Sequence, residues 1–101
     1  MKPMEVEIVL ILAEVRAPGG RWSYDKLARE LSRRTGRDVY PTSVGRSIKV
    51  LKARGVVDDE LGLRVVPERA VQIARDYSHH PGVEESCSRV LSLFGIRGDE
   101  K

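Results

Sequence analysis

Apolar residues recur at helical spacing along most of this chain, and the pattern breaks at glycine and proline. The first apolar run, residues 4–16, is long enough for a buried helix, although a strand is an alternative. It ends at residues 17–20, Ala-Pro-Gly-Gly, a composition typical of a turn. Ser23 then offers an N-cap for a second helix that we expect to end at Gly36. The apolar stripe of this second helix consists of Leu27, Ala28 and Leu31.

The next segment predicts a third helix and a hairpin. Pro41 suits the first position of a helix, and the end of this helix is expected at Gly55. Its apolar stripe follows an i, i+4, i+7 spacing and consists of Val44, Ile48 and Leu51. Two short apolar runs, residues 56–57 and 63–66, flank an acidic segment and predict a β-hairpin with Gly62 in its turn. The chain is therefore expected to be mainly α with a small β-hairpin, in the α+β class.

Two more helices are predicted after the hairpin. The fourth, residues 67–77, has an apolar face made of Ala70, Ile73, Ala74 and Tyr77. A fifth follows residues 79–82, His-His-Pro-Gly, and acidic residues in its first turn suit the helix dipole. Its apolar stripe consists of Val83, Cys87, Val90, Leu91 and Phe94. Because a three-helix core does not consume this much apolar surface, we expect the stripe to form the interface of a homodimer. Residues 1–78 are predicted to be one domain, and 79–101 a packing or dimerisation extension.

Positive charge is concentrated in the middle third of the chain. Residues 21–54 hold ten basic and three acidic side chains, a net charge of +7, whereas residues 1–20 sum to −1 and residues 55–101 to −3. This distribution predicts a localised positive surface suited to a polyanion. For residues 29–37 the alternative is a solvated face in a heat-adapted protein. The absence of asparagine and the abundance of arginine and glutamate favour a thermophilic source.

Several classes of protein are disfavoured by composition. No run approaches the roughly 20 apolar residues of a membrane span, and no signal peptide is evident, so we expect a cytoplasmic protein without a membrane partner. Cys87, the single cysteine, excludes an intrachain disulfide. His79 and His80 lack a cluster of further ligands, so no metal site is predicted. No nucleophile with a base and no phosphate-binding glycine loop is recognised, and we expect no enzymatic activity, no cofactor and no small-molecule ligand.

The aromatic residues are few, five in all. Trp22 and Tyr24 stand at the start of the second helix, where we expect them to pack in the core or as a staple rather than to stack on bases. A protein that binds single strands needs rings along a groove, so this scarcity disfavours that function.

One segment carries a family resemblance. Residues 40–57 read Tyr-Pro-Thr-Ser-Val-Gly-Arg-Ser-Ile-Lys-Val-Leu-Lys-Ala-Arg-Gly-Val-Val. This segment resembles the recognition helix of the winged helix-turn-helix family, with a polar start, an arginine, an aliphatic pair, a basic residue and a glycine leading into the wing. The resemblance covers residues 4–66. It implies a winged helix-turn-helix with additional C-terminal helices, and a transcription regulator of prokaryotic or archaeal type that binds double-stranded DNA sequence-specifically with the helix 41–54.

Helical geometry separates the faces of this helix, because each residue turns the chain by about 100°. The side chains expected outward or on the flank, as candidate base contacts, are Thr42, Ser43, Arg46, Lys49 and Val50. For Lys49 a phosphate contact is the alternative. The candidate phosphate contacts are Lys26, Arg29, Arg33, Arg34, Arg37, Lys52 and Arg64.

Two features depart from the family pattern. The hairpin tip, residues 58–60, is acidic and would repel phosphate, so a contact between the wing and DNA is disfavoured, and Arg64 is the one basic residue of the wing that could make it. The connection over residues 35–41 is longer than the simplest helix-turn-helix turn. A second hypothesis is therefore a protein-interaction module of a replication, segregation or transcription assembly, using the acidic wing and the C-terminal helices. RNA is a third, lesser option.

Overall fold

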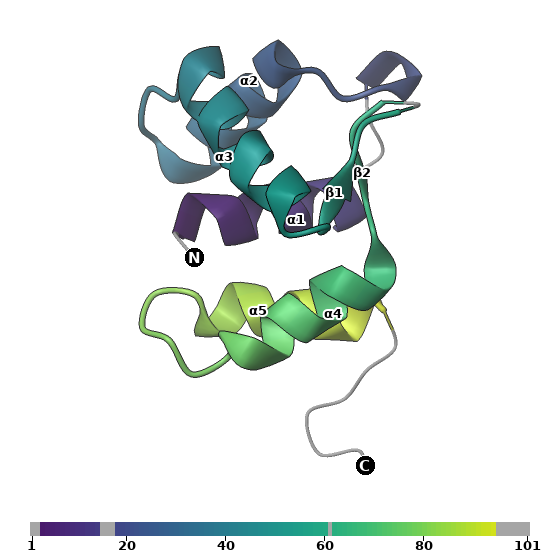
Figure 1. Ribbon diagram of the computed structural model, residues 1–101. Coiled ribbons are helices and arrows are strands. Elements are labelled where there is room, and N and C mark those ends of the chain that lie inside the picture. The colour runs from purple at the N-terminus through teal and green to yellow at the C-terminus, as the bar shows by residue number, and fades with distance from the viewer. Residues whose placement is uncertain (1–2, 15–17, 61, 95–101) are drawn as a thin grey trace.

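The elements follow one another as three helices, a short hairpin and two helices (Figure 1). The structure is a computed structural model that describes residues 3–14, 18–60 and 62–94. The helices are α1 (Pro3–Glu14), the 3-10 turn η1 (Pro18–Gly20), α2 (Tyr24–Thr35), α3 (Pro41–Ala53), α4 (Pro67–Asp76) and α5 (Glu84–Leu93). The strands β1 (Val57–Asp58) and β2 (Arg64–Val65) pair antiparallel, with Val57 opposite Val65 and Asp58 opposite Arg64. The expected mainly helical α+β class is confirmed.

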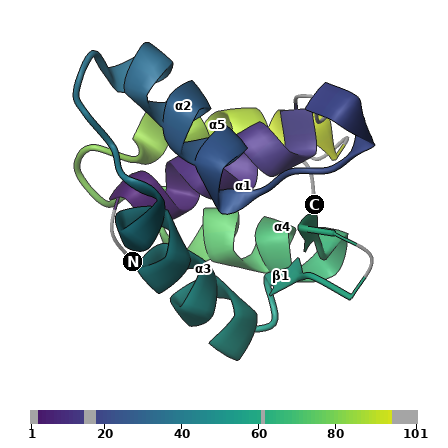
Figure 2. The same ribbon diagram turned by 90° about the horizontal axis from the view of Figure 1, so that it is seen from above.

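Helix α1 lies in the middle of the molecule. Helices α2 and α3 cover one side of it, and α4 and α5 lie on the other (Figure 1). The view from above shows α1 passing beneath α2 (Figure 2). Its buried apolar residues are Val6, Ile8, Val9, Leu10 and Ile11, and Glu5 is buried beside them. A helix whose apolar residues are spread around most of its circumference needs such an enclosed position, and this explains why its sequence shows no continuous polar face. The expectation of a buried helix is confirmed, and residues 15–16 of the predicted run lie outside the described residues.

The ends of α2 are set by local capping. The Ser23 hydroxyl accepts a hydrogen bond of 3.2 Å from the backbone N–H of Lys26, as an N-cap does. At the other end Gly36 has φ of 70°, a left-handed conformation that glycine adopts without strain. The buried stripe is the predicted one, Leu27, Ala28 and Leu31. Trp22 is also buried, as expected.

Helix α3 and the hairpin also begin and end where the sequence predicts. Pro41 starts α3, and Val44, Ile48 and Leu51 are completely buried beneath it. The N–H of Val56 bonds to the carbonyl of Leu51 at 2.9 Å, which turns the chain from the helix into the hairpin. Gly62 stands in the hairpin turn with φ of 99°.

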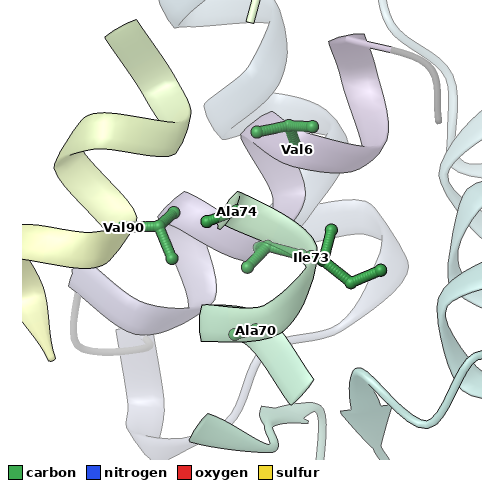
Figure 3. A pocket seen from close by; sticks show the side chains of 6 residues that line it. Val6, Ala70, Ile73, Ala74 and Val90 are labelled. Carbon is green, nitrogen blue, oxygen red and sulfur yellow. The ribbon is translucent and has the colours of Figure 1, made fainter. Parts of the chain in front are cut away.

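Helices α4 and α5 complete the core around α1. Ala70 and Ala74 of α4 are buried, whereas Ile73 and Tyr77 are only half-buried. Side chains from α1, α4 and α5 point toward one another at their junction (Figure 3). The cavity left there is about 10 Å³ and is lined by Val6, Val9, Ala70, Ile73, Ala74 and Val90. Helix α5 therefore packs closely against the other two.

The predicted dimer interface is corrected by this packing. Val83, Cys87, Val90 and Leu91 are buried within a single chain, and Phe94 is half-buried against the same core. In the described residues, this stripe of α5 covers the apolar flank of α1 and is not a free surface, and the homodimer itself stays a prediction. Residues 83–94 of the predicted extension thus pack on the same core as the preceding helices, which is one of the two roles expected for it. Burial also raises the pKa of the Cys87 thiol, with a smaller effect from Glu84, as expected of a cysteine that serves as a core residue.

Among the described residues, no helix has the length and the apolar character that crossing a membrane requires. The same residues contain no group of three or more His, Cys, Asp or Glu side chains placed to hold a metal ion.

Candidate nucleic-acid interface

The outward face of α3 is formed as its sequence predicts. Thr42, Arg46, Lys49 and Ala53 are exposed on the side opposite the buried stripe. Val50 is 38% exposed, and Ser43 is half-buried on the flank. The five candidate base contacts therefore lie on one accessible side of a single helix, which is the geometry that a groove reader needs.

The two cations on this face, Arg46 and Lys49, have no acidic partner among the residues that the structure describes. Within residues 3–14, 18–60 and 62–94, neither Arg46 nor Lys49 forms an ion pair or a side-chain hydrogen bond. Arg54 is exposed at the end of the same helix. Unpaired cations on a helix that also exposes small side chains leave both charge and room for a polyanion.

Helix α2 contributes cations of two kinds. Arg29 is exposed on the side toward the connection to α3, where it borders an open pocket of about 390 Å³ with Asp25, Ser32 and Pro41. Arg33 is also exposed, but both its Nε and its Nη2 donate to Glu30, at 3.2 and 2.5 Å. The bonds from Arg33, followed by the bond from Arg34, lower the pKa of Glu30. In turn, the hydrogen bonds to Glu30 raise the pKa of Arg33.

Arg34, which the sequence predicts to contact phosphate, is instead paired with acidic side chains inside the protein. Its Nε lies 2.9 Å from Glu30, and its Nη2 lies 3.4 Å from Glu14 of α1, which also pairs with Arg89 of α5. Helical rotation places Arg34 on the side of α2 that faces α1, away from α3. It is a link between helices and does not belong to the surface of α3.

The connection between α2 and α3 is held by one serine. The Ser32 hydroxyl accepts the N–H of Val39 at 2.9 Å and lies 3.4 Å from the carbonyl of the same residue. Arg37, in this connection, is exposed and has no ion-pair partner among the residues the structure describes. Lys26, at the other end of α2, donates to the carbonyl of Arg21 at 3.0 Å. Of the predicted phosphate contacts on α2 and the connection, Arg29 and Arg37 are thus the most available.

Two acidic side chains of the hairpin form ion pairs with cations of α3 and β2. Lys52 Nζ lies 2.8 Å from Asp59 Oδ2, and Arg64 Nη2 lies 3.3 Å from Asp58 Oδ2. The hydrogen bond to Asp59 raises the pKa of Lys52, and the N–H of Glu60, followed by Arg64, lowers the pKa of Asp58. Lys52 and Arg64, both predicted phosphate contacts, are therefore engaged within the chain.

Exposed apolar side chains gather at the same surface. Among the described residues four large hydrophobic side chains are exposed, and three of them belong to α3 or adjoin it: Tyr24, Tyr40 and Val50. The fourth is Leu93 of α5. Tyr24 was expected to pack in the core or as a staple but is 40% exposed, with its ring against α3 at Gly45. Tyr40 was missed by the sequence analysis, although its place directly before the N-terminal proline of α3 keeps it out of the buried stripe.

No protein-family model, no curated protein and no solved structure matches this chain. What the chain does must therefore be inferred from the surface around α3 itself, where unpaired cations, exposed tyrosines and short polar side chains occur together.

Proposed function

We propose that this protein is a winged helix-turn-helix regulator of transcription that binds double-stranded DNA sequence-specifically, with α3 in the major groove. The order of three helices and a hairpin supports this proposal, since α2 and α3 pack together and the hairpin follows α3 directly. A regulator of this kind works where the chromosome is, which for a prokaryotic or archaeal protein is the cytoplasm.

One observation carries the proposal: the outward side of α3 presents Arg46 and Lys49 without acidic partners in the described part of the chain. An arginine there can donate two hydrogen bonds to guanine O6 and N7, a contact worth about 1 to 3 kcal/mol of discrimination. Thr42, Ser43 and Ala53 are short and let the helix backbone approach the bases. A charged face that is only solvated does not require short side chains beside its unpaired cations.

Phosphate contacts then position the helix without reading sequence. Arg29 and Arg37 flank the start of α3 and are exposed. Arg33 joins them because an exposed ion pair such as that with Glu30 contributes only about 0 to 1 kcal/mol and exchanges readily for a phosphate. Arg34 is left out of this set.

The proposal is tested by selecting preferred sequences from a random duplex pool and titrating a preferred and a scrambled duplex by fluorescence anisotropy. Arg46→Ala is expected to reduce the discrimination between the two duplexes by about 5- to 150-fold, which corresponds to the loss of one bidentate base contact. Arg75→Ala is the matched control, because it removes one exposed positive charge from α4, on the other side of α1.

Two outcomes contradict the proposal. A wild-type protein that binds no duplex at about 50 mM salt, where electrostatic attraction is strong, cannot act through this surface and favours the protein-interaction module instead. Equal affinities for the preferred and scrambled duplexes, unchanged in Arg46→Ala, would show that α3 reads no bases.

A further inference from the structure

Two tyrosines expose their rings beside α3, and their hydroxyls make no hydrogen bond within the described part of the chain. Tyr40 is 61% exposed and Tyr24 is 40% exposed. In the described residues neither hydroxyl has a hydrogen-bond partner. Tyrosine is among the side chains that contact the DNA backbone, and an exposed hydroxyl that is not used within the described chain is available to donate to such an acceptor.

Both tyrosines are placed beside α3 by their positions in the fold. The carbonyl of Tyr40 accepts the N–H groups of Ser43 at 3.0 Å and Val44 at 3.2 Å, which fixes the backbone of this residue at the first turn of α3, although its side chain makes no cap. The ring of Tyr24 lies beside α3 at Gly45, where an added β-carbon would stand 3.4 Å from the ring, at ordinary van der Waals distance. Each ring is therefore presented at the border of the α3 face.

We infer that Tyr24 and Tyr40 donate hydrogen bonds to phosphate oxygens of a duplex docked on α3, as uncharged positioning contacts. This inference rests on the proposed function and adds two residues that the charge pattern could not reveal. Tyrosine is among the side chains that bind the DNA backbone through a neutral donor. The surrounding charge favours an anionic acceptor, since Lys52 lies close enough to Tyr24 to interact with it electrostatically and Arg46 and Lys49 are exposed on the same helix, α3.

A phosphate contact from a neutral donor differs from a contact from a cation in how the affinity depends on salt concentration. Each Lys or Arg that neutralises a phosphate releases counterions and contributes about 0.9 to the slope of log affinity against log salt concentration. A tyrosine hydroxyl strengthens binding without releasing a cation. Removing it should weaken binding at every salt concentration by the same factor.

The test uses the full chain and three matched variants that each remove one hydroxyl and keep the ring. Tyr24→Phe and Tyr40→Phe are compared with Tyr77→Phe, whose ring lies on α4 against His80 with centroids 4.7 Å apart. Arg29→Ala serves as the reference for loss of a charged contact. Each protein is titrated with the preferred and the scrambled duplex over a series of salt concentrations.

Tyr24→Phe and Tyr40→Phe are each expected to weaken binding to both duplexes by about five- to tenfold with an unchanged salt slope. Tyr77→Phe should bind as the wild type does, and Arg29→Ala should flatten the slope by about 0.9. Tyr24→Phe and Tyr40→Phe binding as tightly as Tyr77→Phe would overturn the inference and leave the proposed function standing. A loss of affinity that is confined to the preferred duplex would assign the two tyrosines to base contacts and would also overturn the inference. A wild-type protein that does not bind duplex DNA would overturn both this inference and the proposed function.

Discussion

Lys52 Nζ, in the last turn of α3, lies 2.8 Å from Asp59 Oδ2 in the hairpin. Each of these groups is partly exposed, so the pair is in contact with solvent. It nevertheless fixes a negative charge beside the helix that we propose to enter the groove. The hairpin would thereby withhold a cation from a duplex that docks on α3 as proposed.

Asp59→Asn should release that cation. We expect the variant to bind duplex DNA up to about fivefold more tightly, with a salt slope steeper by about 0.9, because Lys52 becomes available to a phosphate. The measurement is a series of anisotropy titrations at increasing salt. Glu60→Gln is the control, since it removes a neighbouring negative charge that pairs with no cation in the described residues. If both variants change the slope of log affinity against log salt concentration by the same amount, the net charge of the hairpin sets the affinity and the Lys52–Asp59 pair does not.

Two arginines of α2 that are five residues apart, Arg29 and Arg34, should behave differently. Arg34→Ala is expected to lower the free energy of unfolding by about 1 kcal/mol, because it breaks the links to Glu14 and Glu30, and to leave DNA affinity nearly unchanged. Arg29→Ala should do the reverse, with weaker binding and little loss of stability. Urea unfolding and anisotropy titration of the two variants check this exchange of roles. Weaker binding in Arg34→Ala than in Arg29→Ala would return Arg34 to the interface.

Val90→Ala tests whether α5 belongs to the core of one chain. We expect it to lower the free energy of unfolding by about 2 kcal/mol, since it enlarges the junction with α1 and α4. The unfolding temperature of the variant and of the wild type should not depend on protein concentration over a hundredfold range. A midpoint that rises with concentration would instead indicate that α5 is stabilised by a second copy.

Glu30 should give stability a specific pH dependence. Hydrogen bonds from Arg33 and Arg34 lower its pKa below the ordinary value of 4.5, so its contribution is fully present above about pH 4.5 and is lost as the pH falls through the lowered pKa. Glu30→Gln should therefore be about 1 kcal/mol less stable than the wild type at pH 7, and the difference should vanish in acid. Urea unfolding of both proteins at several pH values between pH 7 and pH 3 measures this difference in the free energy of unfolding. Asp76→Asn, at an exposed carboxylate without an ion pair in the described chain, is the control, and the same pH profile in that variant would contradict the assignment.

Capping residues and the spacing of apolar residues were sufficient to predict the helices and the hairpin. A serine N-cap, a glycine C-cap and a proline at the first helical position mark α2 and α3 within one residue or two, because these signals act on neighbouring backbone groups. The exposed side of α3 followed from helical rotation alone.

What the sequence could not show depends on contacts between distant residues. Arg34 meets Glu14 across 20 residues, and Arg89 meets the same carboxylate across 75. No local pattern tells a cation that links helices from one that awaits a ligand. The stripe of α5 was assigned to a second subunit for the same reason, since the sequence does not reveal that α1 is enclosed and requires a cover.

The enclosed position of α1 limits how this protein can be shortened. A fragment that ends after the hairpin would keep the proposed DNA-reading surface, yet it would expose the apolar flank of α1 that α4 and α5 cover, and such a flank promotes aggregation. Transfer of this surface to another protein must therefore carry the whole chain to at least Leu93, or replace the outer flank of α1 with polar residues.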